Sequence, residues 1–439
     1  VLTGGGEFRS TGAGDFVARN SGATIRTGGT AGDGNVSFVH GGDVSIFAVT
    51  TVGGDINILA GGNVQVRGNL STGGGSDPGN LRSTGQSFVL ASGRTIKTGG
   101  GDVILDHAGD VTIDYSVTTG GGSFVSTGEG NFTAVNSTDR IITQGTGARS
   151  VLIDHDGDVL LYDVTTGGGI VDVDAGGSVR LRGKINTKGS GDSHFSSTGA
   201  SFTSDRGKTI LTGGGNVSLQ HAGPVSVGGA INTGGGNFAS IGDAEYLASD
   251  RYATITTSST ANDGNVVLEH GGNITTRTIA TGGGAVVLLS AGEITALGPI
   301  DAHGTGGPAN IQISAAALTT SNGSQIWTSG GDVTLDVDGD VVLGEYLRTD
   351  GGDFRSNGIG SLRTVDTGAY IRTYGGRAII DRQGPVEFNA IFDTGGGAFD
   401  LTLHIHTGIS GPLLDVYRNL DFNGGTLTID MDETSVNNL

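Results

Sequence analysis

The chain has 439 residues, of which 86 are glycine, 6 are proline and none is cysteine, and its formal net charge is −20. This composition excludes a collagen-like protein, a disulfide scaffold and thiolate chemistry, and the 35% of hydrophobic residues argues against disorder. The acidic charge disfavours nucleic acid as a partner, and no apolar run approaches the ~18 residues that a membrane span needs.

The tetrapeptide Thr-Gly-Gly-Gly recurs along the chain. Its threonines are Thr3, Thr72, Thr98, Thr119, Thr166, Thr212, Thr233, Thr281 and Thr394. The interval from Thr3 to Thr72 is about three times the interval from Thr98 to Thr119, so both are multiples of one unit. The spacing predicts a structural repeat of roughly 21 to 24 residues.

Short runs of alternating apolar residues lie between these tetrapeptides, for example at 103–105 and 111–113, and they end at glycine. Such runs are typical of strands separated by tight turns, and three of them fit one repeat. A strand that pairs with its equivalent one repeat later must pair in parallel. The sequence therefore predicts an all-β, single-stranded parallel β-helix, or β-solenoid, of about 20 coils. We expect regular repeats over 1–398 and degenerate terminal coils of the same solenoid over 399–439.

Three kinds of coil follow one another, and residues 56–64, 102–111 and 124–128 are examples. The third kind carries Phe-x-Ser-Thr-Gly. We expect its first residue to fill the interior of a wider coil. The residues in this position are Phe8, Leu81, Phe124, Phe195, Phe238 and Phe354.

The second of these examples, 102–111, contains a histidine. Coils of this kind have His40, His107, His155, His221 and His270 in the same position, and later Val337 and Arg382. The intervals between successive residues of this series alternate between 66–67 and 45–49 positions. A long interval corresponds to three coils and a short one to two. Together they indicate a higher-order repeat of 115 residues, or five coils. Copies two or three coils apart are too distant to share one metal ion. We interpret these histidines as structural corner residues bonded to turn backbone.

Two acidic turns resemble calcium-binding loops. Their carboxylates are Asp154, Asp156, Asp158, Asp336, Asp338 and Asp340. Neither the twelve-residue helix-flanked loop nor the nonapeptide of calcium-binding β-rolls occurs. We interpret them as solvated turn aspartates and keep Ca²⁺ held between coils as the alternative. No other cofactor is expected.

Catalysis is not expected. We find no acidic pair flanked by basic residues that departs from the repeat, and the breaks in the repeat carry Ser, Thr, Gly and Asn. Ice binding would need a flat two-dimensional array of threonines, whereas the repeat supplies one per coil.

Val1 lies within a coil, and the repeat loosens after Thr394. We expect the natural polypeptide to continue beyond at least one end, or copies to stack end to end, because open strand edges are usually capped. Any export signal would lie outside this sequence.

Residues 61–75 (Gly-Gly-Asn-Val-Gln-Val-Arg-Gly-Asn-Leu-Ser-Thr-Gly-Gly-Gly) and 176–187 (Gly-Gly-Ser-Val-Arg-Leu-Arg-Gly-Lys-Ile-Asn-Thr) resemble the central repeats of filamentous-haemagglutinin-like bacterial exoproteins, which are secreted by a two-partner route. The resemblance covers residues 1 to about 398. It implies a right-handed β-helix, export across a bacterial envelope and a role as a fibre or adhesin.

The leading hypothesis is thus a structural or adhesive rod of a secreted filament or giant adhesin, extracellular and on a bacterial cell surface. Its expected partners are copies of itself, flanking parts of a longer chain, glycans or extracellular matrix. The alternatives are a polysaccharide-processing β-helix enzyme and an adhesin stalk stiffened by calcium.

Overall fold

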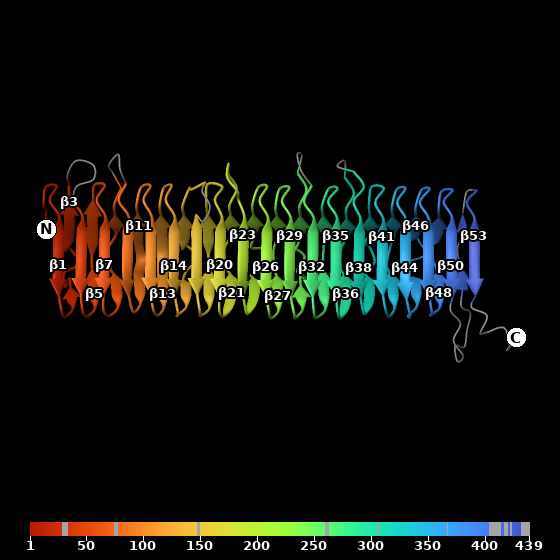
Figure 1. Ribbon diagram of the computed structural model, residues 1–439, viewed down its shortest axis with the longest axis horizontal. Helices are drawn as coiled ribbons and strands as arrows, with labels where there is room; N and C mark the ends of the chain where they lie inside the picture. Colours follow the sequence, from red (N-terminus) through yellow and green to blue (C-terminus); the bar gives the residue numbers. More distant parts are fainter. Residues whose placement is uncertain are drawn as a thin grey trace. The chain divides into compact units, whose positions relative to one another are not determined.

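The computed structural model describes residues 1–28, 34–73, 78–146, 150–259, 263–304, 307–366, 368–403, 414–416, 420–421 and 424–431. They form two units, Val1–His221 and Ala222–Leu439, which are described separately. Within each unit the strands follow one another coil by coil (Figure 1). The described residues contain no helix, and so none that could cross a membrane.

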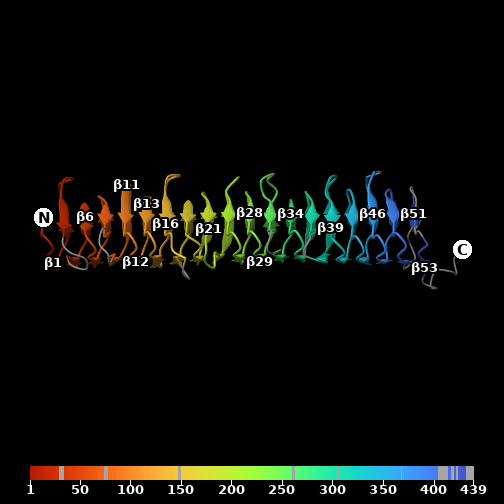
Figure 2. The ribbon, with the colours of Figure 1, turned by 90° about the horizontal axis from the view of Figure 1, so that it is seen from above.

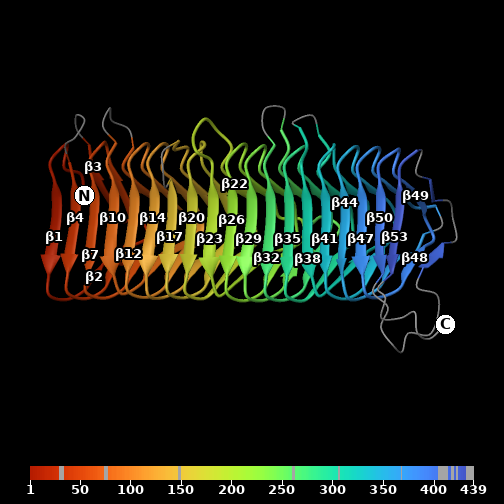
Figure 3. The same ribbon diagram turned by 45° about the vertical axis from the view of Figure 1, so that its right-hand side comes forward.

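Each complete coil supplies strands to three faces, which we call the first, second and third face, and the three turns between them are the first, second and third corner. Within each unit the described strands pair in parallel with the strand of the same face in the neighbouring coil, as in the pairing of Val103 with Phe124. Figures 2 and 3 show these faces from two further directions. The fold is therefore an all-β parallel β-solenoid, as expected. The hand of the coil stays a prediction.

In the first unit the first face has ten strands: β1 (Phe8–Gly12), β4 (Val36–His40), β7 (Ile56–Ala60), β10 (Leu81–Gly85), β12 (Val103–His107), β14 (Phe124–Gly128), β17 (Val151–His155), β20 (Val171–Ala175), β23 (Phe195–Gly199) and β26 (Val217–His221). The second face contains β2 (Phe16–Val17), β5 (Val44–Ile46), β8 (Val64–Val66), β11 (Phe88–Lys97), β13 (Val111–Thr118), β15 (Phe132–Ala134), β18 (Val159–Leu161), β21 (Ser178–Leu181) and β24 (Ser201–Ser204). The third face contains β3 (Thr24–Thr27), β6 (Ala48–Thr51), β9 (Leu70–Ser71), β16 (Arg140–Ile142), β19 (Asp163–Thr165), β22 (Ile185–Asn186) and β25 (Ile210–Leu211), and the long strands β11 and β13 continue into it.

In the second unit the first face has nine strands: β29 (Phe238–Gly242), β32 (Val266–His270), β35 (Val286–Ser290), β38 (Ile311–Ala315), β41 (Val333–Val337), β44 (Phe354–Gly358), β47 (Ala378–Arg382), β50 (Phe399–Leu403) and β53 (Leu427–Met431). The second face contains β27 (Val225–Val227), β30 (Tyr246–Leu247), β33 (Ile274–Thr276), β36 (Glu293–Ala296), β39 (Ala317–Thr320), β42 (Val341–Leu343), β45 (Leu362–Thr364), β48 (Val386–Phe388) and β51 (Leu414–Val416). The third face contains β28 (Ile231–Asn232), β31 (Ile255–Thr256), β34 (Ile279–Ala280), β37 (Ile300–Asp301), β40 (Ile326–Trp327), β43 (Leu347–Arg348), β46 (Tyr370–Arg372), β49 (Ile391–Asp393) and β52 (Leu420–Asp421).

Coil length varies more than the sequence predicts. The equivalent turn residues Asn35 and Asp55 of neighbouring coils are separated by 20 positions, whereas Asp15 and Asp43 are separated by 28. The range of coil lengths expected from the tetrapeptide spacing was therefore too narrow. Residues can be added at a corner without changing the strand register, because the strands on either side still pair with their equivalents. Much of 399–439 lies outside the described residues.

The third corner explains the recurring tetrapeptide. In 119–122 the side chain of Thr119 is buried, and its hydroxyl donates a hydrogen bond to the carbonyl oxygen of Gly122. Gly120 and Gly121 have φ angles of 72° and 136°, which side chains rarely tolerate. A Cβ on Gly122 would lie 2.3 Å from the carbonyl oxygen of Gly101 on the preceding coil. Each position of the motif thus has its own steric or hydrogen-bonding role.

The interior of each unit is lined by alternate residues of the strands. In β12 the side chains of Val103, Leu105 and His107 point inward and those between them are more exposed. The expected interior residues Leu81, Phe124, Phe195, Phe238 and Phe354 are buried, which confirms the prediction, and Phe8 is half-buried. Coils that begin with these phenylalanines have an added turn at the second corner, for example the turn closed by the Asp139 N–H and the Asn136 carbonyl at 2.9 Å.

Candidate functional site

The histidine column lies at the inner side of the first corner, as the sequence predicts. His155 Nδ1 lies 3.2 Å from the carbonyl oxygen of Gly130, and its Nε2 lies 2.9 Å from the hydroxyl of Ser126. A carbonyl can only accept, so Nδ1 carries the proton and Nε2 accepts from the serine. The structural interpretation of this column is thus confirmed for His155, and the turn backbone is its partner.

Serine is the part of this arrangement that the sequence reasoning missed. His40, His107 and His270 bond in the same way to Ser10, Ser83 and Ser240, one coil earlier, at 3.0, 3.1 and 3.0 Å. The signal was present in the Phe-x-Ser motif, two residues after the interior phenylalanine. Where Val337 replaces histidine, the serine position holds Ile313. Serine and histidine are therefore both absent at Val337, whereas Arg382 replaces the histidine and keeps the serine as Ser356.

Burial favours the neutral form of four histidines of the column. It lowers the pKa of His107 and of His221 from 6.5 to about 4, and it also lowers the pKa of His155 and His270. A neutral imidazole enclosed in the interior is not placed to exchange protons with a substrate on the surface. The histidine column therefore has a structural role.

Arg382 occupies the same inner position with a charged group, and its side chain is 0% exposed. Its guanidinium donates to Ser356 Oγ at 3.2 Å and to the carbonyl oxygens of Gly360 at 2.9 Å, Asn357 at 3.0 Å and Val337 at 3.2 Å. Burial lowers the pKa of Arg382. The carbonyl oxygens of two earlier coils thus compensate for the loss of water around the charge.

The six predicted calcium candidates do not converge. Asp158 accepts the backbone N–H of Ser178 at 2.7 Å, and Asp340 accepts the backbone N–H of Ser361 at 2.8 Å. Asp336 accepts the amide of Asn357 at 2.8 Å. The other three, Asp154, Asp156 and Asp338, have exposed side chains at the same turns. Within the described ranges, no group of three or more His, Asp or Glu side chains is arranged to hold a metal ion. Asp158 and Asp340 thus each join their own coil to the next one by a hydrogen bond from its backbone.

The threonine column is not a surface array. The threonines of the tetrapeptide are buried, from Thr72 to Thr394, and Thr3 is only partly exposed. The hydroxyls face the third corner and not the solvent, which agrees with the argument from the sequence against an ice-binding array.

One stretch of the third face in the second unit departs from the repeat in a way that the sequence reasoning overlooked. We name it the Trp327 patch. It consists of His303, Trp327, Tyr346, Arg348, Asp350, Tyr370, Arg372, Tyr374 and Asp393. These side chains come from, precede or follow β37, β40, β43, β46 and β49, so five consecutive coils contribute to it.

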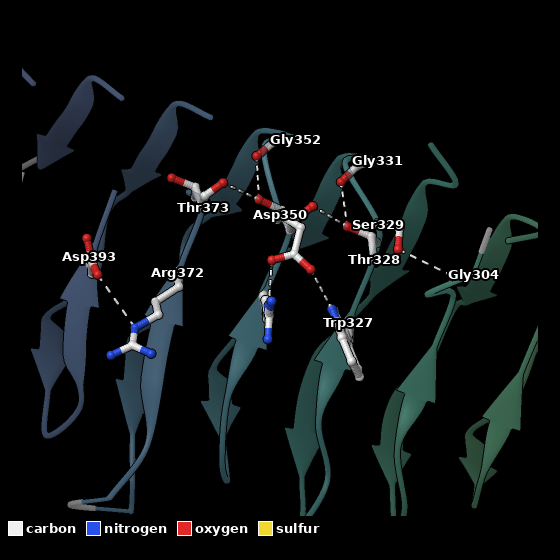
Figure 4. A network of polar contacts seen from close by, with 12 residues as sticks. Gly304, Trp327, Thr328, Ser329, Gly331, Asp350, Gly352, Arg372, Thr373 and Asp393 are labelled. Carbon is white, nitrogen blue, oxygen red and sulfur yellow. Dashed lines mark hydrogen bonds and ion pairs between the residues drawn. The ribbon is translucent and has the colours of Figure 1, made fainter. Parts of the chain in front are cut away.

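Asp350 is the centre of the patch. Its carboxylate accepts a hydrogen bond from Trp327 Nε1 at 3.0 Å and one from Arg348 Nε at 2.5 Å, so both of its oxygens are occupied. Figure 4 shows this carboxylate turned toward Trp327. The bond to Asp350 raises the pKa of Arg348. The guanidinium therefore stays charged at any ordinary pH.

Rings and guanidinium groups stack along the coils. His303 and Trp327 have centroids 4.0 Å apart at 22°, and the guanidinium of Arg348 lies 5.1 Å from the centroid of the Trp327 ring and 4.9 Å from that of Tyr374. These are cation–π distances. The ring faces of Trp327 are thus covered, while Tyr374 is 45% exposed.

A second column runs beside the first. Tyr346 and Tyr370 are nearly parallel, with centroids 4.7 Å apart at 5°, and Arg372 lies 4.4 Å from the Tyr370 centroid. Arg372 also lies 3.6 Å from Asp393 (Figure 4). The patch therefore combines two ion pairs with four aromatic rings and one imidazole.

Two residues of the patch occupy a backbone position that favours glycine. Asp350 and Tyr374 have φ angles of 55° and 52° and stand where the first glycine of the Thr-Gly-Gly-Gly motif is expected. The sequences Thr-Asp-Gly-Gly and Thr-Tyr-Gly-Gly were the visible signal, together with the single tryptophan. The expectation that the repeat is broken only by Ser, Thr, Gly and Asn was wrong.

No family model, no curated protein and no solved structure matches the chain.

The sequence signals and the geometry therefore carry the functional argument alone. Two features remain after the structural columns are accounted for: the stacking of coils within each unit and the Trp327 patch.

Proposed function

We propose that the chain is a structural and adhesive rod of a secreted bacterial surface protein and that it performs no catalysis. The observation that carries this proposal is the use of the interior polar groups. Threonine hydroxyls, histidine imidazoles and the Arg382 guanidinium bond to the backbone or side chains of their own or neighbouring coils. Such groups stiffen a stack of coils and leave the outer faces to make contacts.

The resemblance of residues 61–75 and 176–187 to filamentous-haemagglutinin-like exoproteins supports the extracellular location and the role in a fibre or adhesin. The net charge of −20 keeps such a protein soluble and favours basic or uncharged partners over phosphate-rich ones. Copies of the chain, glycans and extracellular matrix are the partners that we propose.

Immunogold electron microscopy of the producing cells tests the location and the role. Antibodies raised against the chain are expected to label structures that project from the cell surface. Labelling confined to the cell interior would contradict the proposal. In parallel, the purified chain is expected to release no reducing ends from a panel of polysaccharides, and reproducible release would support a polysaccharide-processing enzyme instead.

A further inference from the structure

We propose that the Trp327 patch binds a neutral polysaccharide that lies across successive coils. This inference deepens the adhesive part of the proposed function and rests on it. Four properties of the patch support this ligand: the kinds of groups that the patch exposes, its charge, its spacing and its backbone strain.

The groups that it exposes suit sugar hydroxyls and the apolar faces of pyranose rings. Tyr374 offers an exposed ring, and tyrosine supplies rigid, amphipathic contact area at a low cost in conformational entropy. Arg372, two residues earlier on the same outer side, offers planar N–H donors, and Asp393 on the next coil offers acceptors. Donors and acceptors beside a ring are what a polyhydroxylated ligand needs.

The charge of the patch favours a neutral ligand over an anionic one. Arg348 is paired with Asp350 and Arg372 with Asp393, so neither guanidinium contributes an uncompensated positive charge. The whole chain carries −20 and repels polyanions at long range. A uronate or sulfated chain would have to displace an existing carboxylate partner, whereas a neutral glycan can share the hydrogen-bonding groups that remain.

The spacing favours a polymer over a globular protein. Equivalent side chains on neighbouring coils repeat at roughly 4.8 Å along the stack. A hexose unit of an extended polysaccharide advances by a similar distance. The patch spans five coils from His303 to Asp393, so successive sugar units would meet side chains at a matching interval.

Both strained residues in the described part of the second unit, Asp350 and Tyr374, place their side chains in the patch. Glycine would satisfy the corner at both positions without strain, whereas a residue with a side chain is disfavoured there. Both positions supply side chains to the same patch. Strain in a residue of this kind is common at binding sites.

The test uses the intrinsic fluorescence of Trp327, which is the only tryptophan in the chain. The purified chain is titrated with cellohexaose, xylohexaose and chitohexaose as neutral probes, and with polygalacturonate as an anionic probe. At least one neutral probe is expected to shift or quench the emission in a saturable way. A response to polygalacturonate alone, or no response to any neutral probe, would overturn the inference.

Variants that restore the glycine separate binding from stability. Asp350→Gly and Tyr374→Gly remove the strain that a side chain causes at positive φ, so the melting temperature should fall little. The affinity for the neutral probe should weaken at least about tenfold. The matched control is Gln144→Gly, which relieves the same strain at φ 55° in the first unit and should leave affinity unchanged. Full affinity in both patch variants would overturn the assignment of the site. A negative result here would leave the immunogold experiment, and with it the structural role, unaffected.

Discussion

Ser83 and His107 form a buried pair across two coils, with Oγ and Nε2 3.1 Å apart. The same pair is formed by Ser10 and His40, by Ser126 and His155 and by Ser240 and His270, whereas no such hydrogen bond joins Ser197 to His221. Ile313 replaces the serine where Val337 replaces the histidine. The interior therefore accepts either a polar pair or an apolar pair, but a mixed pair would leave a buried hydroxyl or imidazole without a partner.

This relationship predicts coupling between the two positions. His107→Val alone should lower the free energy of unfolding by about 1–3 kcal/mol, because the Ser83 hydroxyl loses its partner. Adding Ser83→Ile, which copies Ile313 and Val337, should recover part of that loss. Urea unfolding of the two single variants and the double variant measures the coupling. Strictly additive effects would contradict the account.

Stability should depend on pH through the same residues. The folded-state pKa of His107 and His221 is about 4 and the unfolded value is 6.5, so the unfolded chain binds more protons between these values. Their contribution to stability is fully present above about pH 6.5 and is lost as pH falls toward 4. The melting temperature should therefore fall over this range, and more shallowly in the His107→Val/Ser83→Ile variant. Equal slopes in the two proteins would argue against the buried neutral histidine.

Arg382 provides a second test of the interior. Arg382→Met should destabilise the chain by about 3 kcal/mol or more, because several buried carbonyl oxygens lose their donor. Arg382→His should cost less than half as much, since histidine can bond to Ser356 and Gly360 as His155 does to Ser126 and Gly130. Guanidinium chloride unfolding of both variants gives the comparison. Equal losses would show that the inner position does not favour histidine.

Calcium should have no effect on melting. Asp158 and Asp340 already accept backbone N–H groups of the following coil, and a metal ion would compete with those bonds. Thermal unfolding with EDTA and with added CaCl₂ should give the same midpoint. A higher midpoint in calcium would revive the calcium-stiffened stalk.

The fold could be predicted from the sequence because both of its determinants are periodic. Alternation of apolar residues places Val103 and Leu105 inside, and the recurring Thr-Gly-Gly-Gly motif marks the third corner. The coil lengths were predicted less well, because residues added at corners do not interrupt the alternation. The strands between Phe8 and Val36 therefore do not indicate that this coil is long.

The candidate site was harder to predict, because it depends on contacts between coils. Trp327 lies in one coil and Arg348 and Asp350 in the next, and only the register of β40 and β43 brings the three side chains together. Each residue alone is compatible with an ordinary exposed position on a strand. The sequence shows that Asp350 and Tyr374 replace a glycine of the repeat. Only the φ angles show that both residues keep the backbone conformation that favours glycine.

We propose that the chain forms a structural rod in a larger surface assembly. Electron microscopy of the isolated native particle tests this proposal. We expect thin, unbranched fibres or stalks along which antibodies against the chain bind. Isolated compact particles that carry a polysaccharide-cleaving activity would contradict it.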